Sequence, residues 1–164
     1  MKTVVSDSST LIAFLDCGRI GWLFDLFAEI VIAQEVYREI TYKNDYRPLL
    51  QEYLDHGRLT VETVGHAHLY AMLIKRLNPG ESESIVLAKE RALPLVVDER
   101  KGRTTAQSLQ IPVIGTIGIL LKLIDKKIVT HAEAIDIMQQ LEANHFRLSL
   151  ELKKLVYNYT GAQS

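Results

Sequence analysis

Acidic side chains recur in this sequence where buried strands are expected to end. Asp7 follows the β-branched run 3–6, and Asp98 and Glu99 follow the apolar run 94–97. Because the carboxyl ends of parallel strands share one edge of a sheet, we expect these acids to meet there. Mg²⁺ prefers carboxylate oxygens among protein ligands. The grouping therefore predicts a metal site that activates water and stabilises the leaving oxygen of a phosphodiester.

Further acids on helices could complete this group. Glu39 lies one turn beyond Glu35 on the helix expected after strand 29–32, and Glu81 and Glu83 start the helix that precedes strand 94–97. Acids are also common at helix N-termini, where they cap the helix and interact with its dipole. Glu81 and Glu83 could therefore serve the helix alone.

Asp7 is the acid that a purely structural role explains least well. It interrupts an apolar strand-to-helix passage, at a position where burial of a carboxylate needs a compensating partner. It could act as the helix N-cap, but Ser8 or Ser9 could do the same.

Basic residues stand beside the acids in the sequence. Arg100, Lys101 and Arg103 directly follow the acidic pair 98–99, which would place cations where a phosphate is bound. Ser8 and Arg38 are further candidates for contacting nucleic acid. The alternative for the basic run is a solvated loop with local ion pairs.

Short apolar strands alternate with helices along the chain. We expect strands at 3–6, 29–32, 59–64, 94–97 and 111–114, and helices that include 20–27, 34–42, 46–54, 66–77, 81–91, 104–109, 116–123 and 132–141. This alternation predicts an α/β fold with a mainly parallel sheet of four to five strands covered on both faces. The length of 164 residues suits a single domain, 1–164, with C-terminal helices from about 131.

Composition narrows the classes of function. The formal charge is -1, so a polyanion would need a local basic patch or metal ions. Cys17 is the only cysteine, and no apolar run is long enough to span a membrane, which favours a cytoplasmic protein. His66 and His68 face different sides of a helix, so zinc is disfavoured. No phosphate-binding glycine loop or serine-hydrolase motif is present.

Five segments, taken in order, resemble the PIN domain. They are VVSDSSTLIAF, IVIAQEVYREI, GESESIVLAKE, LVVDERKGR and IPVIGTIGILL, which together cover about residues 3–125. They are most similar to the prokaryotic branch of predicted nucleic-acid-binding proteins termed DUF3368, and the C-terminal helices also look like that branch. The resemblance implies a three-layer αβα fold and a nuclease that uses Mg²⁺ or Mn²⁺ to hydrolyse RNA.

The resemblance also assigns roles to the acids. Asp7 matches the family's first acid, and Glu39 the second, with Glu35 competing. The third is matched by Glu81 or Glu83, while Asp98 and Glu99 compete for the last. Many relatives carry Thr or Ser before these last acids, where this chain has Val97.

Function is predicted from the same resemblance. Small relatives are often dimeric toxins that a small antitoxin protein neutralises, so the main prediction is a metal-dependent ribonuclease toxin. The alternative is a catalytically silent PIN fold that binds nucleic acid or a protein partner. A receiver-like, small-ligand-binding protein is a weaker third reading, because the required Asp and Lys pair is not evident.

Overall fold

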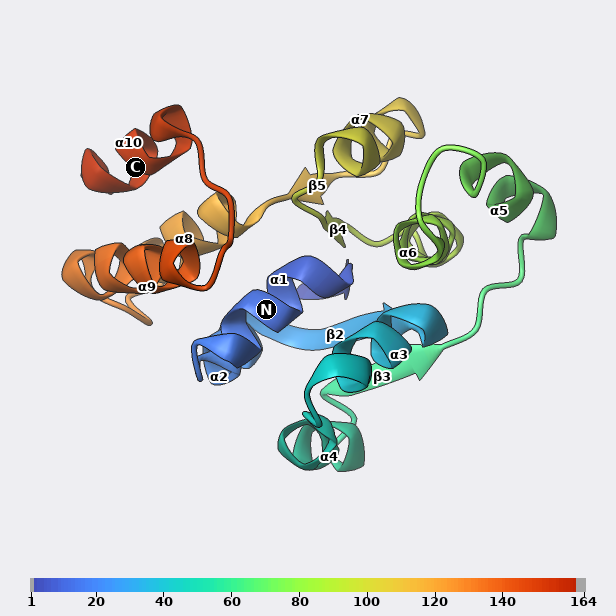
Figure 1. Cartoon of the computed structure of the whole chain (residues 1–164), viewed down its shortest axis with the longest axis horizontal. Helices are drawn as coiled ribbons and strands as arrows, with labels where there is room; N and C mark the ends of the chain where they lie inside the picture. Colours follow the sequence, from blue (N-terminus) through green and yellow to red (C-terminus); the bar gives the residue numbers. More distant parts are fainter. Residues whose placement is uncertain (1, 162–164) are drawn as a thin grey trace.

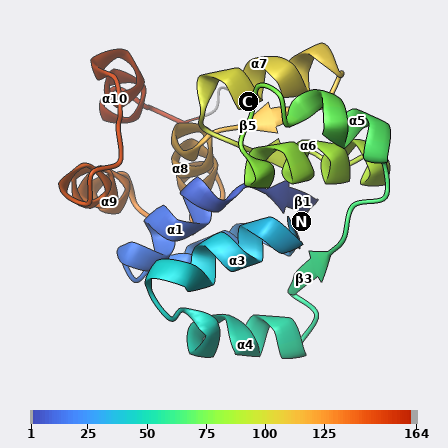
Figure 2. The same ribbon diagram turned by 45° about the vertical axis from the view of Figure 1, so that its right-hand side comes forward.

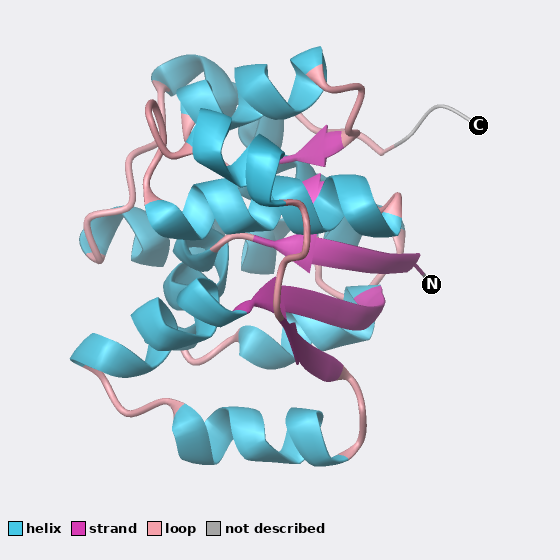
Figure 3. Ribbon diagram, turned by 90° about the vertical axis from the view of Figure 1, so that its right-hand side faces the viewer, coloured by secondary structure: helices cyan, strands magenta, loops and turns pink. Residues whose placement is uncertain are grey.

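A parallel sheet forms the centre of the protein. The computed structural model describes residues 2–161, apart from the side chain at position 43. Its sheet contains β1 (Lys2–Ser6), β2 (Phe27–Ala33), β3 (Leu59–Glu62), β4 (Leu95–Val96) and β5 (Val113–Ile114). Neighbouring strands are all parallel, in the order β3-β2-β1-β4-β5 (Figures 1 and 3). The predicted α/β fold is confirmed, with the strand predicted at 59–64 lying at an edge.

Helices connect and surround the strands. They are α1 (Ser8–Asp16), α2 (Ile20–Leu26), α3 (Gln34–Lys43), α4 (Arg47–Asp55), α5 (Ala67–Leu73), α6 (Pro79–Arg91), α7 (Arg100–Ser108), α8 (Thr116–Asp125), α9 (His131–Ala143) and α10 (Leu150–Tyr157). The chain moves across the sheet in one direction from β1 to β3, and in the other from β3 to β5. Right-handed connections then place the two sets of intervening helices on opposite faces.

The central strands are apolar because helices cover them. Val4, Val5 and the run 30–33 are at most 2% exposed, which is the continuous apolar pattern of a buried parallel sheet. Val5 is paired with Val31 on one side and Leu95 on the other. The N-termini of α3 and α6 follow strands or turns at one end of the sheet, and these helices pack against each other (Figure 2). No helix in residues 2–161 is long and apolar enough to cross a membrane.

Side-chain caps explain where some helices differ from the sequence prediction. The helix predicted at 66–77 is shorter, because His66 is its N-cap and accepts a hydrogen bond from Leu69 N at 3.1 Å, and the helix ends at Leu73. The helix predicted at 104–109 begins earlier, at Arg100, because Glu99 is its N-cap. The basic run therefore lies on the first turn of α7 and not in a loop. The predicted Thr130–Glu133 capping box is present at the start of α9.

Candidate active site

Asp7 stands at the turn from β1 to α1 with a carboxylate that is poorly satisfied. Its backbone N–H donates to Val96 O of β4 at 2.9 Å, which fixes the turn against the sheet. Asp7 has the N-cap position of α1, but its side chain makes no capping hydrogen bond. The residue is 5% exposed, and its Oδ1 has no hydrogen-bond partner among the described residues. A buried oxygen of this kind is a costly feature unless it serves a ligand.

Neighbouring carboxylates raise the pKa of Asp7 further. Taken together, the surroundings raise the pKa of Asp7 to about 7, with burial as the largest cause and a hydrogen bond from the Ser8 backbone opposing it in part. The negative charges of Glu81, Glu39 and Asp98 add to the increase. Like charges act in this way only at short range, so acids from α3, α6 and the segment after β4 meet around Asp7 at the end of β1.

Glu39 approaches this group from α3. Ser8 Oγ donates a hydrogen bond to Glu39 Oε2 at 2.5 Å. The other oxygen, Oε1, lies only 2.2 Å from where a Cβ would stand at Gly80. A glycine on the first turn of α6 thus leaves the space that the Glu39 carboxylate fills.

Glu81 combines a capping role with a place in the acid group. Its backbone N–H donates to Asn78 Oδ1 at 2.8 Å, and its carboxylate accepts from Asn78 N at 3.4 Å, which completes a capping box. The residue as a whole is 8% exposed. Burial raises the pKa of Glu81, as do the charges of Glu99 and Glu39, while Asn78 N–H and Lys101 oppose the increase. Helix capping therefore does not remove Glu81 from the electrostatics of the group.

Asp98 is the most heavily hydrogen-bonded acid of the group. It accepts from Thr10 Oγ1 at 2.7 Å, from Thr116 Oγ1 at 2.6 Å and from Thr116 N at 2.9 Å. The last contact makes Asp98 the cap of α8, the helix whose own N-cap residue, Gly115, has no side chain. Both threonines are buried, so the three donors hold the carboxylate in one orientation.

The remaining acids lie at the edge of the group or outside it. Glu83 Oε2 accepts from the backbone N–H of Glu35 at 2.9 Å and so caps α3, while Glu35 is ion-paired with Arg38 at 2.7 Å. Glu99 accepts from Gly102 N at 2.8 Å at the start of α7, and its charge acts on Glu81. Of the alternatives that the sequence left open, Glu39, Glu81 and Asp98 are the residues that surround Asp7.

A PIN domain family model, DUF3368, matches residues 3–161 of this sequence. The chain belongs to this PIN family. Among solved structures, a PilT N-terminus domain protein from the hyperthermophilic archaeon Sulfolobus solfataricus is similar, with 20% identity and a TM-score of 0.49 over 73% of this chain and 90% of that one. No curated protein matches the sequence. PIN domains are typically nucleases, and the acid group lies where this PIN chain brings its strand ends together.

Two threonines of this PIN domain were missed from the sequence. Thr10 lies one helical turn after Asp7, on the same face of α1, and Thr116 follows Gly115 directly after β5. The spacing of Thr10 from Asp7 is the one sequence signal for these residues. Each threonine matters because it donates a hydrogen bond to Asp98, and the sequence alone does not show that contact.

The predicted nucleic-acid-binding residues fall into two sets. Arg100 and Lys101 are exposed on the first turn of α7, and Arg103 Nη1 and Asp98 Oδ1 both lie within 3.2 Å of the Cβ position of Gly115. Lys101, whose charge acts on Glu81, and Arg103 therefore border the acids. Arg38, however, is engaged by Glu35, and Ser8 is buried and donates to Glu39.

A hollow of about 550 Å³ opens beside Glu39. Its lining includes Ile12, Arg38, Glu39, Tyr42 and Tyr46, and Tyr42 is 84% exposed. Aromatic and apolar walls of this kind can stack against a planar ring beside the carboxylates.

The acid group has the donor chemistry that a hard divalent cation requires. Every side chain in it offers carboxylate oxygens, and the Asp7 oxygen lacks a protein donor. Within residues 2–161, no three side chains already form a group able to hold a metal ion. Binding of an ion would therefore require at least one carboxylate to turn towards it, while the three donors keep Asp98 in place.

Proposed function

We propose that this protein is a metal-dependent endoribonuclease that hydrolyses RNA phosphodiester bonds. The observation that carries the proposal is the buried Asp7 oxygen, which has no hydrogen-bond partner among the described residues and is surrounded by Glu39, Glu81 and Asp98. A helix cap does not explain it, because the Asp7 side chain makes no capping bond. Three neighbouring carboxylates disfavour its charged form, and a cation would reverse that effect.

Asp7 and Asp98, with Glu39, Glu81 and Glu99 around them, are the residues that would hold Mg²⁺ or Mn²⁺. A bound ion of this type supplies a water of lowered pKa and neutralises charge on a phosphodiester. Thr10 and Thr116 orient Asp98 for that role. Such support from neighbouring donors is a common feature of metal ligands.

The surrounding residues would hold the RNA strand. Arg100, Lys101 and Arg103 would contact phosphates at one side of the acids, where they would position the strand without reading its sequence. Arg38 and Tyr42 would hold the strand on the other side, at the hollow that Glu39 also lines.

Family membership supports a more specific role. We infer from it that the protein is the toxin of a toxin–antitoxin pair, acting in the cytoplasm as a homodimer that a small antitoxin neutralises. Growth arrest on expression, relieved by Asp7→Asn, is the expected result. Growth of cells producing the unaltered, folded protein at the same level would count against the toxin role.

A second candidate is a catalytically silent PIN module that binds RNA or a protein. The observation in its favour is that Glu81, Asp98 and Glu99 each cap a helix, which gives these acids a structural function. This reading predicts RNA binding that is independent of metal and of Asp7.

The deciding experiment compares the unaltered protein, Asp7→Asn and the matched control Asp136→Asn, which removes an exposed acid on α9. Each is incubated with structured and single-stranded RNAs in Mn²⁺, Mg²⁺ or EDTA, and Mn²⁺ binding is measured by calorimetry. We expect metal-dependent cleavage that Asp7→Asn reduces by about 10³-fold or more, a loss typical of removing a group central to the reaction. Folded protein that neither cleaves RNA nor binds Mn²⁺ would favour the silent module.

A further inference from the structure

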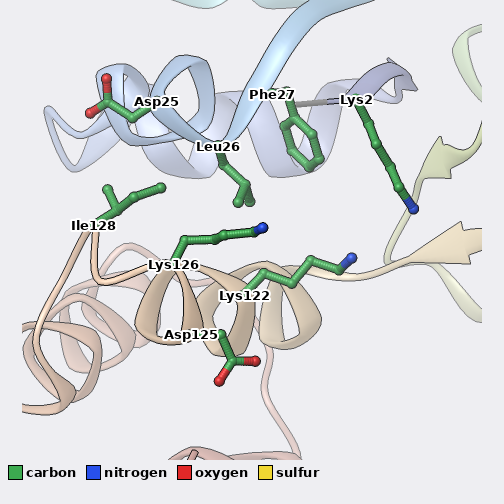
Figure 4. A pocket seen from close by; sticks show the side chains of 8 residues that line it. All are labelled: Lys2, Asp25, Leu26, Phe27, Lys122, Asp125, Lys126 and Ile128. Carbon is green, nitrogen blue, oxygen red and sulfur yellow. The ribbon is translucent and has the colours of Figure 1, made fainter. Parts of the chain in front are cut away.

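A second cavity lies at the opposite end of the sheet from the acids. It has a volume of about 750 Å³, and its lining includes Lys2, Phe27, Lys122 and Lys126 (Figure 4). Lys2 and Phe27 are the first residues of β1 and β2, whereas Asp7 follows the last residue of β1. Lys122 lies in the last turn of α8 and Lys126 directly follows that helix, so both are at the opposite end of α8 from Thr116, which bonds Asp98. The cavity is therefore a separate feature from the candidate active site.

Positive charge is directed into this cavity. In Figure 4 the side chains of Lys2, Lys122 and Lys126 extend towards the same space beside Phe27, whereas the carboxylates of Asp25 and Asp125 point away from it. None of the three lysines has an ion-pair partner in the part of the chain that the structure describes.

Helix electrostatics account for part of this arrangement only. Lysines at the C-terminal end of a helix interact favourably with its dipole, which suits Lys122 in the last turn of α8 and Lys126 at its C-cap. Lys2 begins a strand and gains nothing from that dipole. Asp25 and Asp125 also line the cavity, but in Figure 4 both carboxylates point away from the space that the lysines face, and Asp125 accepts a hydrogen bond from the Tyr159 hydroxyl. Three like charges that face one space are best compensated by an anion.

The wall of the cavity is apolar. Leu26, Phe27 and Ile128 stand beside the lysines, so a ligand would meet both a charged and an apolar surface. The volume falls in the usual range for small-molecule sites, of about 300–1,000 Å³. An inorganic anion would use only the lysines, whereas an organic phosphate would use both surfaces.

We propose that this cavity binds a nucleotide, with its phosphates against Lys2, Lys122 and Lys126 and its organic part against Phe27 and its apolar neighbours. The nucleotide is either free or the 5′-phosphorylated end of an RNA. The inference does not depend on nuclease activity, because the cavity shares no residue with the acid group.

The test measures ADP binding by calorimetry in EDTA, so that metal cannot recruit the nucleotide to the acids. The proteins compared are the unaltered chain, Lys122→Ala/Lys126→Ala, and the control Lys75→Ala/Lys154→Ala, which removes two exposed lysines elsewhere. Because hydrogen bonds to charged groups are the stronger ones, we expect Kd to rise roughly tenfold or more in the first double variant and less than about twofold in the control.

Parallel measurements identify the source of the phosphate. Tighter binding of ADP than of pyrophosphate supports a free nucleotide that uses the apolar wall. Failure of ADP to bind, with a 5′-phosphorylated hexanucleotide bound more tightly than its 5′-hydroxyl form and lost in the cavity variant, supports an RNA end. Equal weakening in both double variants, or no binding of ADP and of either oligonucleotide, overturns the proposal. Thermal melts confirm that the variants are folded.

Discussion

At the carboxyl ends of the strands, Asp7 and Glu81 are more than nine-tenths buried, and their neighbours hold Asp98 and Glu39 in place with short hydrogen bonds. At the amino ends, Lys2, Lys122 and Lys126 are exposed on long side chains. The acid end is thus fixed in geometry and electrostatically unfavourable, whereas the lysine end is adaptable and costs the fold little. Fixed groups suit chemistry at one bond, and adaptable cations suit capture of an anion.

The largest expected effect is on the free energy of unfolding, which the buried Asp7 carboxylate lowers when it is charged. Its pKa is about 7 in the folded protein and near 3.8 when unfolded, so between these pH values only the folded state binds the proton. Stability from this group is therefore lost as pH rises from about 4 to 7. In EDTA, we expect Asp7→Asn to be more stable than the unaltered protein by about 4 kcal/mol at pH 8 and by little at pH 4. Denaturant unfolding at both pH values measures this, and a pH-independent difference would contradict it.

Gly80→Ala should displace the Glu39 carboxylate and so lower cleavage without destabilising the fold. The new Cβ would stand 2.2 Å from Glu39 Oε1, and the carboxylate is the end of a flexible side chain that can move away. Alanine also stabilises a helix relative to glycine by about 0.5–1 kcal/mol. We expect cleavage to fall by roughly 10–100-fold with little change in unfolding. Gly21→Ala is the control, because its Cβ would make only an ordinary contact, 3.6 Å from the Tyr53 hydroxyl.

Thr116→Val tests whether the donors to Asp98 serve the acid group or only the fold. The change removes one of its hydroxyl donors, and a hydrogen bond to a charged group contributes about 1.5–3 kcal/mol. Thr60→Val is a matched control, since Thr60 Oγ1 donates to the Glu29 carboxylate at 2.6 Å on the edge of the sheet. We expect both variants to lose stability in denaturant, but only Thr116→Val to weaken Mn²⁺ binding. Equal Mn²⁺ affinity in the two would assign Asp98 to the fold alone.

The smallest effect is expected at the lysine end. Removal of Lys122 and Lys126 should change the free energy of unfolding by no more than about 0.5 kcal/mol per site, because both are exposed and lack ion-pair partners in residues 2–161. A loss of several kcal/mol in urea unfolding would mean that these lysines have a structural role, and the contrast between the two ends would fail.

Sequence patterns predicted the sheet and Asp7 because both depend on local order. The β-branched run 3–6 and the apolar run 30–33 each predict a strand, and Asp7 directly follows the first of them. The choice between Glu81 and Glu83 depended on tertiary structure, since Glu83 caps α3 through a backbone N–H of another element. The lysine cavity was not predicted either. Its residues come from β1, α2, β2, α8 and the segment after α8, and they meet only when the strands are assembled.

One contact also bears on the order in which the chain becomes functional during synthesis. Thr10 and Asp98 are bonded across 88 positions of sequence, and Asp98 is in turn held by the first residue of α8. Contacts of such long separation form late, because a large loop must close before they stabilise anything. A nascent chain that has emerged only as far as α7 carries all of the acids around Asp7 but lacks the two Thr116 donors that hold Asp98. Translation itself would then delay the complete acid group until α8 has left the ribosome.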